Sequence, residues 1–433
     1  MQYFIGILLV LSSLHHGGDN IYFQWYSSIL AFGVLFILHG YRRFGTFKSF
    51  YFVLSLYFYY ILCNAAYVAE FRSNRYAGNP TEIKTFISYS SLAYVFYVLL
   101  FFTVLSFLDH RKVIKAIGYW GLVNTAYVLY GFVTGSGLLK WGQGYSGFIH
   151  YSSVNSCLIA ATIPLFPKLN LTDLSYVFET VGLRRLSTFL RSMDSVYVRH
   201  VPHALGTVAV FLGKSSIPLG TIFVVFFTLA MFKFINKANW KKVVPCLVIT
   251  GVTFTLACST LDRHLFDSGY RFQAYRLFFN NWYDRANMFT GFGPGIHKAL
   301  APEVQYFNNF MVGVVSEGHA VSSNFWWLQL HSDWLEHLIE LGVVGVFFLL
   351  LAFVIMSVIF IRTNNIRPLA SFWGLSATAL FNFPIKYFPG AFILGALTYT
   401  ATKLEEQWKK EKAFEKRFGF RPTRSESSSY LQD

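Results

Sequence analysis

The sequence predicts an all-α protein that crosses a lipid bilayer about twelve times. Of its 433 residues, 54% are hydrophobic, 20% are aromatic and only 13% are charged, whereas soluble domains carry about 25% charged residues. The apolar residues occur in unbroken runs of about 15 to 24, without the polar–apolar alternation of a transmembrane barrel. These features exclude a soluble enzyme and favour helices whose backbone hydrogen bonds are satisfied within each span.

Polar breaks between the apolar runs define the expected spans. The first follows Met1 directly, without a basic segment or a cleavage site, and so reads as a span and not as a removed signal peptide. The spans are expected near 1–14, 22–40, 49–69, 85–108, 116–139, 149–166, 203–213, 215–235, 243–261, 338–361, 368–383 and 387–402.

The distribution of Lys and Arg sets the expected orientation. The loops 41–48, 109–115, 167–202, 233–242 and 362–367, together with the tail, hold 25 of the 36 basic residues. The positive-inside rule therefore places both termini in the cytoplasm. One transmembrane domain (1–402) is expected to precede a basic, partly disordered cytoplasmic tail (403–433). The long loop 262–325, between spans 9 and 10, is expected on the outer face.

The net charge of +15 does not indicate nucleic-acid binding, because the basic residues lie between the apolar runs. The four cysteines lack C-x-x-C spacing, and no HExxH motif occurs. We therefore expect no nucleic acid, no disulfide framework, no metal site and no cofactor.

Segment 167–202 fits neither a span nor a short loop. Its apolar residues recur at helical spacing, with arginines among the polar ones. This pattern predicts a basic amphipathic helix on the inner leaflet, attracted by anionic lipid. The apolar residues are Leu174, Val177, Phe178, Val181, Leu186, Phe189 and Leu190, and the arginines are Arg184, Arg185 and Arg191.

Titratable residues concentrate in the outer loop. The loop also holds a glycine turn, Gly291-Phe292-Gly293-Pro294-Gly295, and ends just before His331, roughly two turns ahead of a long apolar run. The loop residues are Arg263, Arg271, Arg276, Arg285, His264, His297 and His319. His331 is thus expected at the outer membrane–water boundary, either as a functional base or as a core or interfacial histidine.

After His331, four polar residues form one helical stripe, at i, i+3, i+4 and i+7. This spacing is typical of a solvated or interfacial face. The four are Asp333, Glu336, His337 and Glu340.

Lys214 interrupts an apolar stretch near the outer end of its span. A lysine at membrane depth costs roughly 2.5–3.5 kcal/mol on insertion scales. It therefore either serves a function or extends its ammonium group to the interface.

Taken in order, these features resemble the O-antigen ligase and polymerase superfamily of bacterial membrane glycosyltransferases, over roughly residues 140–350. The family signature His-Asn-x-x-Leu-x4-Glu-x-Gly-x-x-Gly appears here with Ser332 in place of Asn. The other matching positions are His331, Leu335, Glu340, Gly342 and Gly345.

Three further elements are similar to the family pattern. Gly-Arg-x-x-x-Trp and its following turn appear as Gly269-Tyr270-Arg271, Tyr275 and Gly291-Phe292-Gly293. A small residue, a cation and a serine at the start of a span appear as Gly213-Lys214-Ser215. Gly-x-x-x-x-Pro-Asn looks like the segment from Gly147 to Asn155, with Val154 in place of Pro.

The resemblance implies a ligase-like enzyme of the inner membrane whose periplasmic site transfers a glycan from undecaprenyl diphosphate to a glycolipid or glycan hydroxyl, without a metal. Arg271 and Lys214 suit the diphosphate by charge, and His331 suits a general base, so that attack opposite the leaving group inverts the anomeric centre. Expected substrate-binding residues are Arg276, Tyr275, Asn155, Gly293 and His297.

Other interpretations remain open at this stage. A polymerase of the same superfamily uses the same chemistry, although no Arg in the chain has Gly eleven positions later, a spacing described for O-antigen polymerases. A polysaccharide or lipid transporter also has many spans, but carriers place substrate sites near the bilayer midplane. A purely structural membrane protein would not need Lys214 and Arg271 at these positions.

Overall fold

The computed structural model describes residues 98, 101, 102, 105, 108–136, 140, 141, 144–149, 152–235, 288–291, 332–381, 385 and 388–418. Of this part, 84% is helical, which confirms the predominantly helical fold. The expected spans before residue 98 and between residues 236 and 287 lie outside the described residues.

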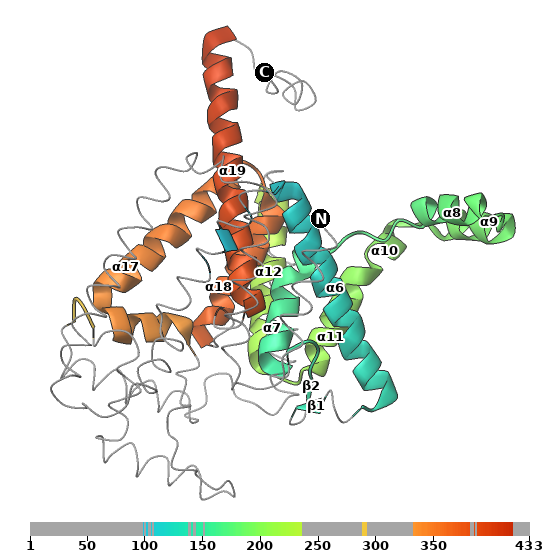
Figure 1. The fold of residues 1–433 in the computed structure, drawn as a ribbon, viewed down its shortest axis with the longest axis horizontal. Coiled ribbons are helices and arrows are strands. Elements are labelled where there is room, and N and C mark those ends of the chain that lie inside the picture. Colours follow the sequence, from blue (N-terminus) through green and yellow to red (C-terminus); the bar gives the residue numbers. More distant parts are fainter. Residues whose placement is uncertain are drawn as a thin grey trace, which may run out of the picture.

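Helices account for nearly all described elements (Figure 1). Besides them there is a two-stranded antiparallel hairpin with Lys140 opposite Tyr145. The elements are α6 (His110–Thr134), β1 (Lys140–Trp141), β2 (Gly144–Tyr145), α7 (Ser152–Thr162), the 3-10 turn η3 (Ile163–Leu165), α8 (Leu171–Thr180), α9 (Arg184–Met193), α10 (Val196–Arg199), α11 (Val201–Leu212), α12 (Ser216–Ile235), α17 (Asp333–Arg362), α18 (Ile366–Phe381) and α19 (Phe388–Phe418).

The long helices form a bundle in which described helices that follow each other directly along the chain, such as α11 and α12 or α17 and α18, run in opposite directions (Figure 1). α7 packs on α6, α11, α12 and α18, while α19 contacts α6, α17 and α18. The segments that join the helices therefore lie alternately at two ends of the bundle. Segment 166–200, the α17–α18 turn and the end of α19 lie at the upper end in Figure 1, and the α11–α12 turn lies at the lower end.

Local signals explain where α6 begins and ends. Asp109 caps its start by accepting a hydrogen bond from the Arg111 amide at 2.9 Å. Gly135 ends it in a left-handed conformation with φ of 64°, which glycine adopts without steric cost. The helix therefore begins six residues before the start of the span expected at 116–139, and it ends five residues before the end of that span.

Small and hydroxyl residues bring α12 and α18 close together. A Cβ on Gly374 would lie 2.6 Å from Val225 Cγ2, so glycine is needed there for steric reasons. The buried hydroxyls of Thr221 and Thr378 are 2.6 Å apart and join the two helices by a hydrogen bond. Small residues and interhelical hydroxyl bonds are what bring helices together in a lipid environment.

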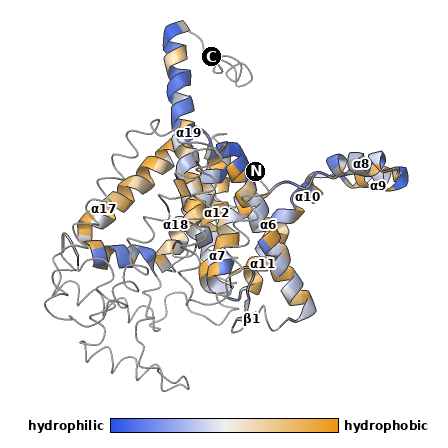
Figure 2. Cartoon of the chain, in the orientation of Figure 1, coloured by the Kyte–Doolittle hydropathy of each residue, from blue (hydrophilic) through white to orange (hydrophobic). Residues whose placement is uncertain are grey.

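Helix α17 bends sharply at Gly342, whose φ of 66° and ψ of −166° are not helical. The short part before the bend is largely hydrophilic and the long part after it is hydrophobic (Figure 2). Within the described residues, α17 is the helix that is long and apolar enough to cross a membrane. The 20 residues after the bend (343–362) would measure about 30 Å, the thickness of a bilayer core.

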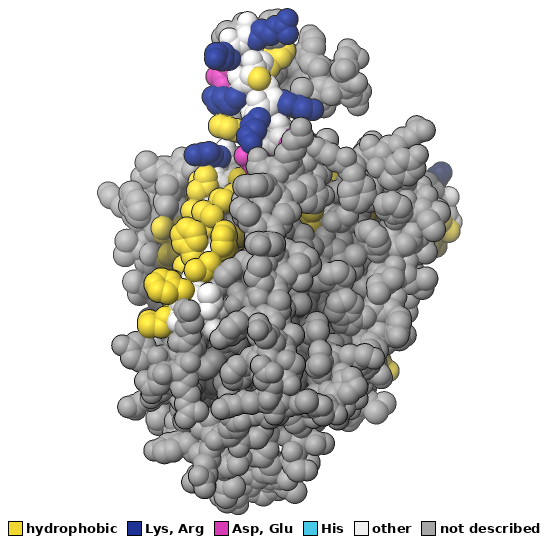
Figure 3. All heavy atoms as spheres, turned by 60° about the vertical axis from the view of Figure 1, so that its left-hand side comes forward, with side chains coloured by type: hydrophobic (Ala, Val, Ile, Leu, Met, Phe, Trp, Pro, Cys, Tyr) yellow, Lys and Arg dark blue, Asp and Glu magenta, His cyan; other side chains and the backbone are white. Residues whose placement is uncertain are grey.

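The apolar part of α17 keeps one side uncovered. Figure 3, which brings α17 forward, shows apolar side chains in a continuous band below the Lys and Arg side chains of α19. The members of this band include Val343, Phe347, Leu350, Val354 and Ile361, which are 43% to 58% exposed. A contiguous apolar surface of this kind marks a contact with lipid or with another protein.

Helix α19 continues well past residue 402, where the transmembrane domain was expected to end. Its extension is held by pairs three or four residues apart, among them Lys403–Glu406 and Lys409–Glu405. Such pairs stabilise a helix independently of tertiary packing. The basic tail is therefore helical to Phe418, and residues 419–433 lie outside the described part.

Candidate functional site

The turn between α11 and α12 places Lys214 in an unusual backbone conformation. The amides of Gly213 and Lys214 donate to the carbonyls of Val210 and Phe211, which closes the end of α11. Lys214 itself has φ of 46° and is exposed. Positive φ is uncommon for a residue with a Cβ, so the turn holds this ammonium group at some conformational cost.

The start of α7 packs directly against this turn. Ser153 Oγ and Ser215 Oγ are 3.1 Å apart, and a Cβ on Gly213 would collide with Ser156 Oγ. The same turn also contacts β2, because a Cβ on Gly144 would collide with the Gly213 carbonyl. Gly213 therefore has to be small, and two separate elements fix the position of Lys214.

This arrangement brings two helix N-termini to one lysine. α7 begins at Ser152 and α12 begins at Ser216, and the hydrogen bond between Ser153 and Ser215 joins their first turns. Helix N-termini carry partial positive charge and free amide donors. Lys214 is exposed next to these two helix starts, whose residues Ser152 and Ser215 are buried, and a cation beside helix N-termini suits a phosphate group.

Asn155, an expected substrate-binding residue, is buried at this junction. Its Oδ1 accepts hydrogen bonds from Asn124 Nδ2 at 2.9 Å and from the Ile149 amide at 3.3 Å. Asn124 Oδ1 in turn accepts from the Phe148 amide at 3.0 Å. The two asparagines thus hold the turn that leads into α7, while Asn155 Nδ2 has no partner in the described part of the chain.

A second junction joins the glycine turn of the outer loop to the bend in α17. The amides of Val343 and Val344, freed from the helix by the bend, donate to the carbonyls of Met288 (2.9 Å) and Phe289 (3.2 Å). Gly291 also has positive φ, at 68°, and a Cβ on it would lie 2.6 Å from Gly342 N. Two motifs about fifty residues apart in the sequence therefore meet in space.

The start of α17 explains one departure from the family signature. Ser332, where the signature has Asn, is the N-cap, and its hydroxyl accepts a hydrogen bond from the Leu335 amide at 3.1 Å. Serine and asparagine are about equally good at this position. The exchange therefore preserves the helix start that follows His331.

The polar stripe on α17 is buried, whereas the sequence pattern is typical of a solvated face. Its members are at most 5% exposed. Asp333 Oδ2 accepts from the Ile385 amide at 3.2 Å, and His337 Nδ1 contacts the Asp333 carbonyl at 2.8 Å. The stripe therefore fastens the start of α17 to neighbouring chain. Its members are Asp333, Glu336, His337 and Glu340.

The expected site residues divide into two groups. Lys214 and Asn155 are described, and the structure places them on different sides of the start of α7: Lys214 adjoins Ser215, which bonds to Ser153, whereas Asn155 bonds to Asn124 on α6. Sequence reasoning missed Asn124, Ser153 and Ser156, although the serine-rich start of a span, Ser152-Ser153-Val154-Asn155-Ser156, is a visible signal. The other expected residues lie outside the described part. They are His331, Arg271, Arg276, Tyr275, Gly293 and His297.

Both junctions lie at the lower end of the bundle in Figure 1, where the hydrophilic start of α17 also lies. Among the described residues, no group of three or more His, Cys, Asp or Glu side chains is arranged to hold a metal ion. Comparison with known proteins adds nothing to this geometry, because no family model and no curated protein matches the chain.

Proposed function

We propose that this protein is a membrane glycosyltransferase that moves a glycan from undecaprenyl diphosphate to a hydroxyl of an acceptor glycolipid, in the manner of O-antigen ligases. The observation that carries the proposal is the exposed Lys214 in the turn between α11 and α12, next to Ser215, which bonds to Ser153 at the start of α7. A second support is the contact between the Gly291 turn and the α17 bend. In the order of the chain, these are the elements that resemble the family.

Lys214 and the helix starts next to it suit a diphosphate leaving group. As the bond between the anomeric carbon and the diphosphate oxygen breaks, negative charge grows on the diphosphate. Fixed cations and helix N-termini stabilise that charge in the transition state. Lys214 supplies a point charge, and Arg271 supplies a planar fork that can donate two parallel hydrogen bonds.

The acceptor hydroxyl is the nucleophile. Its oxygen attacks the anomeric carbon from the side opposite the diphosphate, and the glycan is transferred with inversion. His331, whose ordinary pKa lies near neutrality, accepts the hydroxyl proton. Undecaprenyl diphosphate leaves as the second product, so that atoms and charge balance without a redox partner.

Substitutions at Lys214 separate charge from shape. Lys214→Arg keeps the charge and should remain active, whereas Lys214→Met keeps the length but removes the charge. Loss of one preorganised electrostatic contact lowers catalytic rates by about 10²–10³-fold, and we expect a loss of that size. The measurement is transfer from an undecaprenyl-diphosphate-linked glycan in liposomes, per amount of folded protein.

Lys410→Met is the matched control, because Lys410 is also exposed but lies on the α19 extension at the other end of the bundle. It should transfer at the wild-type rate. A fully active Lys214→Met would mean that this lysine only reaches the interface, and the diphosphate site would have to be placed elsewhere.

A further inference from the structure

The hairpin formed by α8 and α9 carries an apolar surface that the bundle does not cover. Figure 1 shows the hairpin standing away from the bundle, joined to it through α10 and the segment after η3. Leu186, Phe189 and Met193 lie on one face of α9 and are 39%, 56% and 46% exposed. Tyr176 on α8 is 57% exposed.

Polar side chains and the Tyr176 ring contribute to the contact between the two helices, with the Arg191 guanidinium of α9 4.7 Å from the centre of that ring. Ser175 on α8 and Ser187 on α9 are buried. Arg191 Nε donates to Ser175 Oγ at 3.0 Å, and its guanidinium group pairs with Glu179. These contacts join the two helices while Leu186, Phe189 and Met193, the apolar face of α9, stay exposed to another surface.

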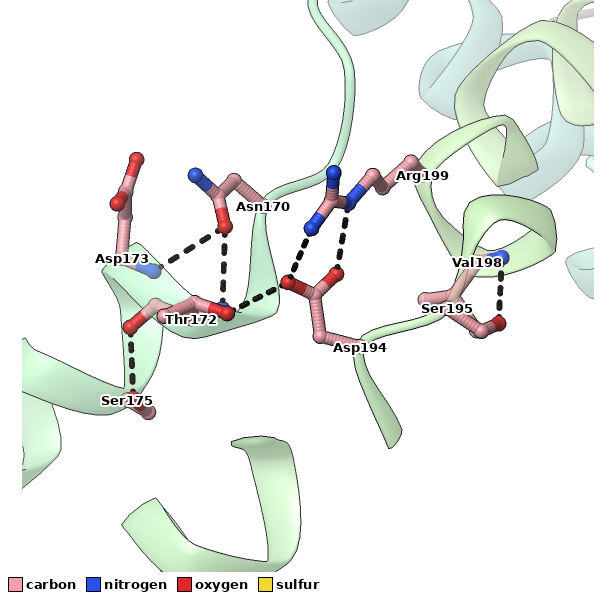
Figure 4. Close-up of polar contacts among 8 residues, drawn as sticks. All are labelled: Asn170, Thr172, Asp173, Ser175, Asp194, Ser195, Val198 and Arg199. Carbon is pink, nitrogen blue, oxygen red and sulfur yellow. Dashed lines mark hydrogen bonds and ion pairs between the residues drawn. The ribbon is translucent and has the colours of Figure 1, made fainter. Parts of the chain in front are cut away.

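The base of the hairpin is fastened by a polar cluster (Figure 4). Asp194 accepts two hydrogen bonds from the Arg199 guanidinium, at 3.1 and 2.9 Å, and a third from the Thr172 hydroxyl. Asn170 Oδ1 accepts from the amides of Thr172 and Asp173, which starts α8. The hairpin is therefore a defined projection and not a loose connection.

Two arginines are placed where the helix itself disfavours them. Arg184 and Arg185 open α9 and are exposed, although cations are unfavourable at the positive end of a helix. Arg191 and Arg199 are already paired with Glu179 and Asp194. An external anionic surface would offset the unfavourable position of the first two.

The α8–α9 hairpin lies where a membrane surface perpendicular to the bundle axis would contact it. In Figure 1, α8 and α9 run across the direction of α19, at the end of the bundle where the α17–α18 turn also lies. Helices with an arginine-rich polar face and an apolar face lie in the plane of a membrane interface.

We propose that the α8–α9 hairpin binds the anionic lipid surface of the inner leaflet, with Leu186, Phe189 and Met193 in the interface and with Arg184 and Arg185 on lipid phosphates. The proposal depends on the expected membrane orientation but not on glycan transfer, because the hairpin lies at the end of the bundle opposite Lys214.

Hydrogen exchange on the full-length protein tests this proposal. The protein is placed, one copy per disc, in nanodiscs of phosphatidylcholine or of phosphatidylcholine with about one third phosphatidylglycerol. The amides of residues 171–193 should exchange more slowly in the anionic discs, on the order of five-fold for each arginine near the surface. The exchange of α7, which is buried within the bundle, should be the same in both.

The double variant Arg184→Gln/Arg185→Gln should lose this lipid dependence. Lys409→Gln/Lys410→Gln, which removes two adjacent exposed lysines from α19, should keep it. Phe189→Gln should also lose protection, because it removes apolar area from the interface. Transfer activity is measured on the same samples, so that a failed hairpin proposal and a failed enzyme proposal remain separate results.

Equal exchange in the two lipids, or equal slowing in the arginine variant, would overturn the proposal. A second set of discs is prepared with two copies each, and slowing that occurs in these discs alone would overturn the proposal and assign the apolar face to a second copy of the chain. Fast exchange in every sample would also overturn the proposal.

Discussion

Lys214 keeps a left-handed backbone conformation that disfavours a lysine by about 1–2 kcal/mol. Glycine or asparagine would fit the turn better, and the neighbouring Gly213 shows that small residues occur there. Backbone strain of this kind concentrates at functional sites. At the scale of single residues, the turn therefore favours a role for the ammonium group beyond solvation of the helix end.

Gly342 offers a test of the junction between the outer loop and α17. Gly342→Ala should lower the free energy of unfolding by more than about 2 kcal/mol, because strain at positive φ adds to a collision with the Phe289 carbonyl. Gly135→Ala is the control, since Gly135 has similar φ but open space around its Cα. It should lose only about 1–2 kcal/mol.

The measurement is unfolding of both variants in detergent at increasing denaturant. Equal losses would mean that the contact between Phe289 and Gly342 contributes nothing, and that the two motifs meet without support from each other.

At the scale of elements, the protonation state of Asp194 makes the stability of the α8–α9 hairpin depend on pH. Hydrogen bonds from Arg199 and Thr172 lower the pKa of Asp194 to about 2. Because the folded pKa lies below the usual 3.8, the carboxylate stabilises the hairpin at all pH values above about 4. This contribution is lost as the pH falls toward 2.

Asp194→Asn imitates the protonated state at neutral pH. We expect trypsin to cleave segment 166–200 faster in this variant than in the wild type, because the bidentate pair with Arg199 is gone. Asp173→Asn removes an exposed carboxylate of the same hairpin but keeps the bidentate pair, so it should raise the cleavage rate much less. Identical rates in the three proteins would contradict a structural role for the pair.

The sequence could predict elements better than their surroundings. The apolar run broken at Gly213-Lys214-Ser215 indicated two helices, and α11 and α12 end and begin there. The polar stripe on α17 was correctly predicted to share one helix face, but the prediction that this face is exposed was wrong. Periodicity shows that one face is more polar than the other, and it does not show what covers that face. The hairpin of β1 and β2 has two residues per strand, too few for any alternation to be visible.

The candidate site could be predicted in part, for a similar reason. Lys214 stood out because a charge in an apolar run is rare. The bonding of Asn155 to Asn124 could not be foreseen, since these residues lie 31 positions apart and nothing local links them. The bend at Gly342 could not be predicted either, because glycine can adopt positive φ but does not have to.

At the scale of the whole molecule, the orientation in the membrane is the first prediction to test. A cysteine placed at Asn308 should react with an impermeant thiol reagent added to spheroplasts, and one placed at Ser427 should react only after permeabilisation. The reason is the excess of Lys and Arg in alternate loops. The reversed pattern would place loop 262–325 in the cytoplasm and contradict a periplasmic site.

Our central proposal is that the protein transfers a glycan from a lipid diphosphate and that His331 is the general base. The most direct measurement is transfer in liposomes with a chelator present, using an undecaprenyl-diphosphate-linked glycan and an acceptor glycolipid. The wild type should transfer with inversion, and His331→Ala should be slower by about 10²–10⁴-fold, as for a lost general base. His337→Gln, at a buried histidine of the α17 stripe, should stay within a few-fold of the wild type per folded molecule. No transfer by the wild type, or equal transfer by His331→Ala, would contradict the account.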